Sequence, residues 1–244
     1  MPAAIKGGRA GASSRVTPPA HQPPATPQTD FGKKVMAHTR YRTSAGKQVP
    51  GVTTVLGVLN KPALVAWANR LGLEGIDSRS YTDEAAAVGK LAHALIECEL
   101  KGEDPDLSDF SQAQIDRAQF GVEAFHTWRA AHQLEPVLVE ASIVSDEFGF
   151  GGTIDCVAVL DDVLTLLDFK TSSGIYDEHK FQVSAYWRLL KEAGYEIKGA
   201  RILKIGRTEG EGLEEHTITG RQILHGWRIF EHCLEIYQLR KGAK

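Results

Sequence analysis

The chain has 244 residues, of which 42% are hydrophobic and 24% are charged, and its formal net charge is −3. These values are typical of a soluble globular protein and exclude a basic protein that coats nucleic acid over its whole surface. No apolar run approaches the roughly 18–20 residues that a membrane-spanning helix needs. The N-terminus also lacks the apolar core of a signal peptide. We therefore expect a cytoplasmic protein with no membrane contact.

The three cysteines, Cys98, Cys156 and Cys233, are far apart and form no CxxC pair. An odd count without clustered spacing predicts neither a zinc site nor a disulfide framework. Buried or free thiols in a reducing compartment are the simpler interpretation.

The chain divides into a tail and one ordered domain. Residues 1–30 are rich in Ala, Gly, Ser, Thr and Pro and contain almost no large apolar side chains. Such a segment cannot bury enough surface to offset the entropy of ordering, so we expect it to be disordered. Residues 31–244 are expected to form a single domain that begins near Phe31.

Helical signals dominate the first half of this domain. Pro62 suits the first position of a helix that continues to about Leu71. Thr82 fits the start of an amphipathic helix to about Leu100, and Ser111 fits the cap of another that ends near His132. A short apolar segment at residues 53–56 precedes them.

Alternating, β-branched residues in the second half indicate strands, and Asp161-Asp162 between two of them predicts a hairpin. We expect strands over residues 136–144, 152–160, 163–169, 200–205 and 213–218, and helices over residues 178–193 and 220–239. This order predicts a mixed α/β domain with a central sheet.

Four short motifs carry candidate chemistry. The first is Gly89, His93 and Glu97, which are spaced four apart and therefore share one helix face. Glycine is disfavoured in a helix by about 1 kcal/mol relative to alanine, so Gly89 hints at a close approach by backbone or substrate. The alternative for His93 is an ordinary core or surface histidine.

The second motif is the run from Gly151 to Asp155, which reads Gly-Gly-Thr-Ile-Asp in an apolar strand. Strand residues alternate between faces, so Asp155 should lie opposite Ile154. A carboxylate in such a strand needs a partner, and a structural salt bridge is the alternative to a functional role.

The third motif contains Asp168 and Lys170, two apart on a strand and therefore on one face. Opposite charges at the end of a buried strand are costly unless they are used or well paired. Asp155 and Asp168 could supply oxygen ligands for Mg²⁺ from adjacent strands, with Lys170 stabilising charge or helping to activate water. The alternative is an Asp–Lys surface pair.

The fourth motif is Gln182 and Tyr186, which share a face of a predicted helix. An amide and an aromatic ring with a hydroxyl suit contacts to a DNA backbone or end, and a helix-boundary contact is the alternative.

Taken in order, His93, the Gly-Gly-Thr-Ile-Asp155 run, Asp168-Phe-Lys170-Thr-Ser and Gln182-x-x-x-Tyr186 resemble the PD-(D/E)xK nuclease superfamily. The similarity is greatest to its RecB-like exonuclease branch, which includes phage recombination exonucleases and the mitochondrial genome maintenance exonuclease. The segment from Val49 to Leu56, with Leu64 and Trp67, is also similar, so the resemblance spans about residues 50–186. Ile154, rather than proline, precedes Asp155, as is common in this branch.

The resemblance implies a restriction-endonuclease-like core, with a central mixed β-sheet flanked by helices. It also implies a role for each matching residue. His93, Asp155, Asp168 and the Phe169 carbonyl would be metal ligands, and Lys170 the catalytic lysine. Further implied residues are the acids Glu140 and Glu97, which would orient ligands or waters, and the DNA contacts Gln182, Tyr186, Thr171 and Ser172. A plain strand-end turn is the alternative for Thr171 and Ser172.

The implied activity is Mg²⁺- or Mn²⁺-dependent hydrolysis of DNA, most naturally exonucleolytic trimming of linear single- or double-stranded DNA. It would serve recombination, repair or replication in a bacterium or phage-infected cell, beside a single-strand-annealing or recombination protein. Three unclustered cysteines predict no iron–sulfur cluster, and no P-loop is present for unwinding. The alternatives are a structure-specific endonuclease on the same fold and a non-catalytic DNA-binding recombination accessory protein.

Overall fold

The structure is a computed structural model that describes residues 39–59 and 61–242. The expected disordered tail at residues 1–30 and the expected domain start at Phe31 lie outside the described residues. No helix within the described part is both long and apolar enough to cross a bilayer. All three cysteines are buried and free, as expected.

A five-stranded mixed sheet forms the centre of the molecule, in the order β3-β4-β5-β6-β7. Its strands are β3 (Leu134–Ser145), β4 (Phe150–Leu160), β5 (Val163–Lys170), β6 (Gly199–Lys204) and β7 (Glu214–Thr217). Only β5 and β6 pair in parallel, and the other neighbours are antiparallel. A second, unpredicted sheet consists of β1 (Tyr41–Arg42) and β2 (Gln48–Val49).

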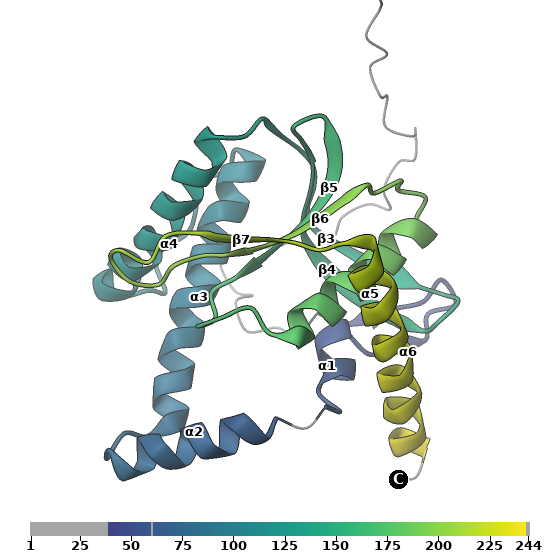
Figure 1. The fold of residues 1–244 in the computed structure, drawn as a ribbon, viewed down its shortest axis with the longest axis horizontal. Coiled ribbons are helices and arrows are strands. Elements are labelled where there is room, and N and C mark those ends of the chain that lie inside the picture. The colour runs from purple at the N-terminus through teal and green to yellow at the C-terminus, as the bar shows by residue number, and fades with distance from the viewer. Residues whose placement is uncertain (1–38, 60, 243–244) are drawn as a thin grey trace, which may run out of the picture.

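Helices cover both faces of the central sheet, which gives three layers (Figure 1). The helices are α1 (Val52–Leu56), α2 (Pro62–Leu73), α3 (Ser78–Lys101), α4 (Gln112–Ala130), α5 (Asp177–Glu192) and α6 (Gly220–Gly242). One apolar cluster joins the sheet to α1, α5 and α6, and another joins it to α3 and α4. The predicted mixed α/β class, with a mixed central sheet flanked by helices, is therefore confirmed.

Most element boundaries follow the local signals in the sequence. Pro62 occupies the first turn of α2, and Ser111 caps α4 in a reciprocal capping box with Gln114. The predicted start of α3 at Thr82 is wrong. The helix begins at Ser78, where the Asp77 side chain accepts the Ser80 N–H. Asp77 is an equally good cap one turn earlier, so the helix gains an additional turn.

The β4–β5 hairpin is the tightest connection in the sheet. Leu160 pairs with Val163, so the turn contains only Asp161 and Asp162. Both have positive φ, 49° and 67°, which is the type I′ geometry that matches the twist of adjoining strands. Because this turn fixes the register, it sets which residues of β4 and β5 face each other at the far end of the hairpin.

Candidate functional site

Asp168 is buried near the end of β5, with none of its surface exposed. Lys170 follows on the same strand, and its Nζ lies 2.5 Å from Asp168 Oδ2. Even so, neither Asp168 oxygen has a donor in hydrogen-bond geometry among the described residues. Burial raises the pKa of Asp168 to about 6, against the lowering effect of Lys170. A pair this buried does not fit the alternative of a surface ion pair.

Asp155 stands where β4 separates from β5. The last paired residues are Cys156 and Leu167, so the β4 backbone no longer bonds the Phe169 N–H. That N–H donates to Asp155 Oδ2 at 2.7 Å. Burial raises the pKa of Asp155, while Lys170 and this hydrogen bond lower it. The Asp155 carboxylate therefore lies between the strands, rather than simply on the face opposite Ile154.

Glu140 faces Asp155 from the neighbouring strand. Its neighbours in β3 pair with the residues on either side of Asp155 in β4, and its φ of 50° is unusual for a residue other than glycine. Burial and the charge of Asp155 raise the pKa of Glu140 to about 8. Backbone strain of this kind often marks functional sites. The structure thus places Glu140 beside Asp155.

Glu97 approaches the same carboxylates from α3. Its charge contributes to the raised pKa of both Glu140 and Asp155, after the larger effect of burial. Its own carboxylate pairs with Lys101, at 2.5 Å between Oε1 and Nζ. Glu97 is therefore near the site but already has a partner.

His93 lies one turn before Glu97 on α3. Its ring meets that of Phe169 edge-on, with centroids 6.1 Å apart. Burial, with a further effect from Lys170, lowers the pKa of His93 to about 4. The imidazole is consequently neutral near pH 7, which is the form that binds metal ions.

Gly89 lets α3 come close to the end of β5. A Cβ at this position would lie 2.4 Å from Thr171 Oγ1, so the close approach expected at Gly89 is to a side chain of the site. The neighbouring Ser172 donates its hydroxyl to the Gly174 carbonyl at 2.7 Å. This bond shows that the Ser172 hydroxyl takes part in the strand-end turn.

Gln182 and Tyr186 are hydrogen-bonded to each other, with Gln182 Nε2 donating to Tyr186 Oη at 2.8 Å. Only 5% of Tyr186 is exposed, and a Cβ at Gly152 would lie 2.5 Å from its ring. The expectation that Tyr186 offers a stacking face to DNA is therefore wrong, because its ring belongs to the core. Burial raises its pKa, and the charges of Asp155 and Asp168 add to the shift, which places the hydroxyl near the carboxylates.

His179 was missed by the sequence reasoning. It lies three residues before Gln182 on α5, and burial together with Lys170 lowers its pKa to about 4. The Tyr176 N–H donates to His179 Nδ1 at 3.2 Å, so the neutral ring carries its proton on Nε2. Helical spacing could have found this residue, because positions i, i+3 and i+7 share one face.

Tyr41 was missed as well. Its hydroxyl is 2.9 Å from Thr153 Oγ1, which is in turn 3.0 Å from Ser142 Oγ. Thr153 precedes Asp155 by two residues on β4. Burial raises the pKa of Tyr41, and Glu140 contributes. Tyr41 belongs to the small β1–β2 sheet that the sequence did not predict, so nothing marked it as a neighbour.

The donor atoms of this site suit a divalent cation in their chemistry but do not surround one point. Among residues 39–59 and 61–242, no three His, Cys, Asp or Glu side chains are grouped closely enough to hold a metal ion. Lys170 Nζ is beside Asp168 Oδ2 and donates to the Phe169 carbonyl at 3.2 Å, so an ammonium lies between two of the predicted ligands. The Asp168 oxygens are buried and contact Lys170 without a hydrogen bond in good geometry, and they are the hard oxygen ligands that Mg²⁺ prefers.

Two solved structures resemble this chain distantly. No family model matches the sequence, and no curated protein matches it. A candidate exonuclease from Eubacterium rectale is 12% identical, with 64% of this chain and 68% of that chain covered and a TM-score of 0.45. LHK-Exo in complex with dAMP is 15% identical, with 66% of this chain and 91% of that chain covered and a TM-score of 0.33. Likenesses this distant assign neither a family nor an activity.

Proposed function

We propose that the chain is a metal-dependent nuclease that hydrolyses phosphodiester bonds in DNA, with residues 31–244 as its single domain. The observation that carries the proposal is the buried Asp168–Lys170 pair beside Asp155. Burying these charges is costly, and the contact with Lys170 offsets only part of that cost, because burial still raises the pKa of Asp168. Carboxyl groups with raised pKa values that share a site with a lysine are typical of catalytic centres.

Asp155 and Asp168 are the residues that would hold a Mg²⁺ or Mn²⁺ ion, with neutral His93 beside them. When bound, such an ion supplies activation of the attacking water and neutralisation of charge on the phosphate and the leaving oxygen. Asp155 is held in place by the Phe169 N–H. Glu140, opposite Asp155, would orient a water against that carboxylate.

Lys170 supplies the fixed positive charge of the centre. It is anchored between Asp168 and the Phe169 carbonyl, and its ammonium would stabilise the negative charge that develops on the phosphate oxygens during hydrolysis. The α5 face that carries His179 and Gln182 adds hydrogen-bonding groups beside this lysine. We infer that this face contacts the DNA backbone near the scissile bond.

The order of motifs along the chain supports an exonuclease of the RecB-like branch, acting on linear DNA in recombination, repair or replication. A single-strand-annealing or recombination protein is the expected partner. This part of the proposal rests on the resemblance described under the sequence, because the geometry of the site is compatible with cutting at ends or within a strand.

The experiment compares end-labelled linear DNA with closed circular DNA, each in Mg²⁺ or in EDTA. We expect progressive loss of label from linear DNA in Mg²⁺, intact circles, and no cleavage in EDTA. Cutting of closed circles would instead assign a structure-specific endonuclease. No cleavage of any substrate, together with no Mn²⁺ binding by calorimetry, would contradict the proposal and favour a non-catalytic DNA-binding protein.

A further inference from the structure

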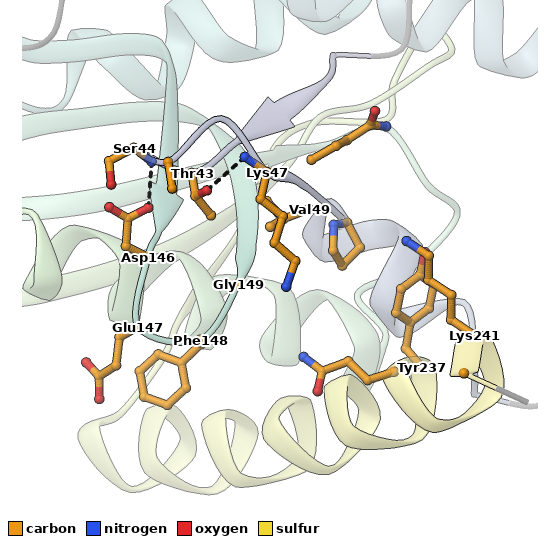
Figure 2. A pocket seen from close by; sticks show the side chains of 15 residues that line it. Thr43, Ser44, Lys47, Val49, Asp146, Glu147, Phe148, Gly149, Tyr237 and Lys241 are labelled. Carbon is orange, nitrogen blue, oxygen red and sulfur yellow. Dashed lines mark hydrogen bonds between the residues drawn. The ribbon is translucent and has the colours of Figure 1, made fainter.

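A groove outside the candidate site lies between the β1–β2 hairpin, the β3–β4 turn and the C-terminal end of α6 (Figure 2). It encloses about 680 Å³ and continues into a neighbouring hollow that shares Gln48, Val49, Pro50, Tyr237 and Lys241 with it. Figure 2 shows Lys47 extending from the hairpin towards α6, with Phe148 at one end of the groove and Tyr237 and Lys241 at the other. Three separate chain segments therefore build one continuous surface channel.

The charges along this channel are unevenly paired. Lys47, Lys241 and Arg40 line it and are exposed, and within the described residues none of them has an acidic partner. The two acids on the wall are already engaged. Asp146 accepts the Ser44 N–H at 2.9 Å, and Glu147 pairs with Arg188 at 3.2 Å. The groove thus presents free positive charge beside the half-buried ring of Tyr237.

One lining residue connects the groove to the strand that carries Asp155. Tyr41 lines the neighbouring hollow and contacts Thr153 through the two hydroxyls, 2.9 Å apart. Thr153 is two strand residues, or about 7 Å, from Asp155. A ligand that lies along the cationic side chains and reaches Tyr41 would therefore be close to the carboxylate cluster.

We propose that this groove binds the phosphate backbone of a DNA strand that runs to the candidate nuclease site, with Lys47, Arg40 and Lys241 contacting phosphates and Tyr237 contacting a base. The inference rests on the proposed function. Exposed lysine and arginine side chains that line one groove match a polyanion, since each phosphate contact releases a condensed counterion. An aromatic ring between such cations is the arrangement that single-stranded DNA favours, because any base can stack on it.

The test measures binding of a fluorescein-labelled single-stranded oligothymidylate in EDTA, where the strand is not cut, over a range of salt concentrations. For the double variant Lys47→Ala and Lys241→Ala we expect weaker binding. We also expect a log–log salt slope that is smaller by about 1.4, at about 0.7 for each lost contact to a single strand. Tyr237→Leu should weaken binding without changing the slope.

The matched control is the double variant Lys198→Ala and Arg221→Ala, which removes the same net charge. Arg221 lies on the same helix as Lys241, about 30 Å away along the helix axis. Lys198 lies near the β4–β5 turn, where its N–H donates to the Leu164 carbonyl, and this turn is at the end of β4 away from the groove. The control should bind like the unmodified chain.

Equal affinity and slope for the two double variants would overturn the groove proposal, as would a failure of the unmodified chain to bind the oligonucleotide. Loss of self-association in the groove variant alone, with an unchanged slope, would assign the groove to a second copy of the chain. The nuclease proposal is tested separately. Groove-dependent binding without cleavage in Mg²⁺ contradicts only the nuclease, and cleavage with groove-independent binding contradicts only the DNA track.

Discussion

The Asp155 carboxylate accepts the Phe169 N–H at 2.7 Å, where β4 stops pairing with β5. A side chain thus replaces a strand partner, and the carboxylate is fixed beside Asp168. The same gap in the sheet faces Glu140, whose backbone has positive φ. The site is therefore built from an interruption of the sheet.

Metal binding should be visible as a gain in thermal stability. Saturating Mn²⁺ should raise the unfolding temperature by about 5–10 °C, because a ligand at about 100 times its Kd contributes roughly 2.7 kcal/mol and each kcal/mol shifts Tm by about 2–4 °C. Asp168→Asn should abolish this gain. Asp109→Asn, at an exposed position, is the control and should keep it. An equal Mn²⁺ response in Asp168→Asn would remove Asp168 from the metal site.

The raised pKa of Glu140 predicts a pH dependence of stability. Burial and Asp155 raise this pKa to about 8, so the folded protein retains a proton that the unfolded chain releases near its ordinary pKa. The resulting stabilisation is complete below the ordinary pKa of 4.5 and is lost progressively as pH rises from there through 8. In EDTA, the unfolding temperature should therefore fall between about pH 6.5 and about pH 8.5, and Glu140→Gln should flatten that fall.

The histidines do not obscure this comparison. Burial lowers the pKa of His93 and His179 to about 4, so their effect on stability appears as pH falls below the ordinary histidine value of about 6.5. This histidine effect is also the same in the unmodified chain and in Glu140→Gln. Parallel curves for the unmodified chain and Glu140→Gln would show that Glu140 does not hold the proton.

Gly89→Ala should destabilise the protein even though alanine favours helices by about 1 kcal/mol. Its Cβ would meet Thr171 Oγ1 at 2.4 Å, and overpacking of this kind costs about 1–3 kcal/mol. Adding Thr171→Ala should restore much of the unfolding temperature, because the clashing hydroxyl is removed. Thermal unfolding of the four proteins of this cycle measures the coupling. Purely additive effects would show that the contact is not made.

His179→Ala should lower the rate of DNA cleavage by about 10–100-fold, in the range found for partners that orient a metal-site residue. The fold should be retained, as judged by the unfolding temperature. The lower rate is expected because His179 lies beside Lys170 and its Nδ1 accepts the Tyr176 N–H. His225→Ala on the exposed side of α6 is the control. Identical cleavage rates in the two variants would exclude His179 from the site.

The sequence predicts the framework of this molecule well because its signals are local. Pro62 and Ser111 start helices at the expected positions, and Asp161-Asp162 closes the hairpin that aligns β4 with β5. Asp168 and Lys170 share a face because strand residues alternate. This alternation does not depend on where the strand lies in the fold.

Contacts between distant segments could not be read in this way. The pairing of Tyr41 with Thr153 depends on a two-residue strand that carries no periodic signal. The gap that holds Asp155 lies beside Glu140, whose positive φ no local residue preference indicates. The burial of Tyr186 against Gly152 likewise follows from how α5 packs on the sheet.

The most direct test of the central claim is the rate of Mg²⁺-dependent cleavage of end-labelled linear DNA by the unmodified chain and by Lys170→Ala. The unmodified chain should cleave. Lys170→Ala should be slower by about 100–1,000-fold, the usual effect of removing one charge-stabilising donor, while still binding the oligonucleotide in EDTA. Undiminished cleavage by Lys170→Ala would contradict the assignment of Asp155, Asp168 and Lys170 as a nuclease centre.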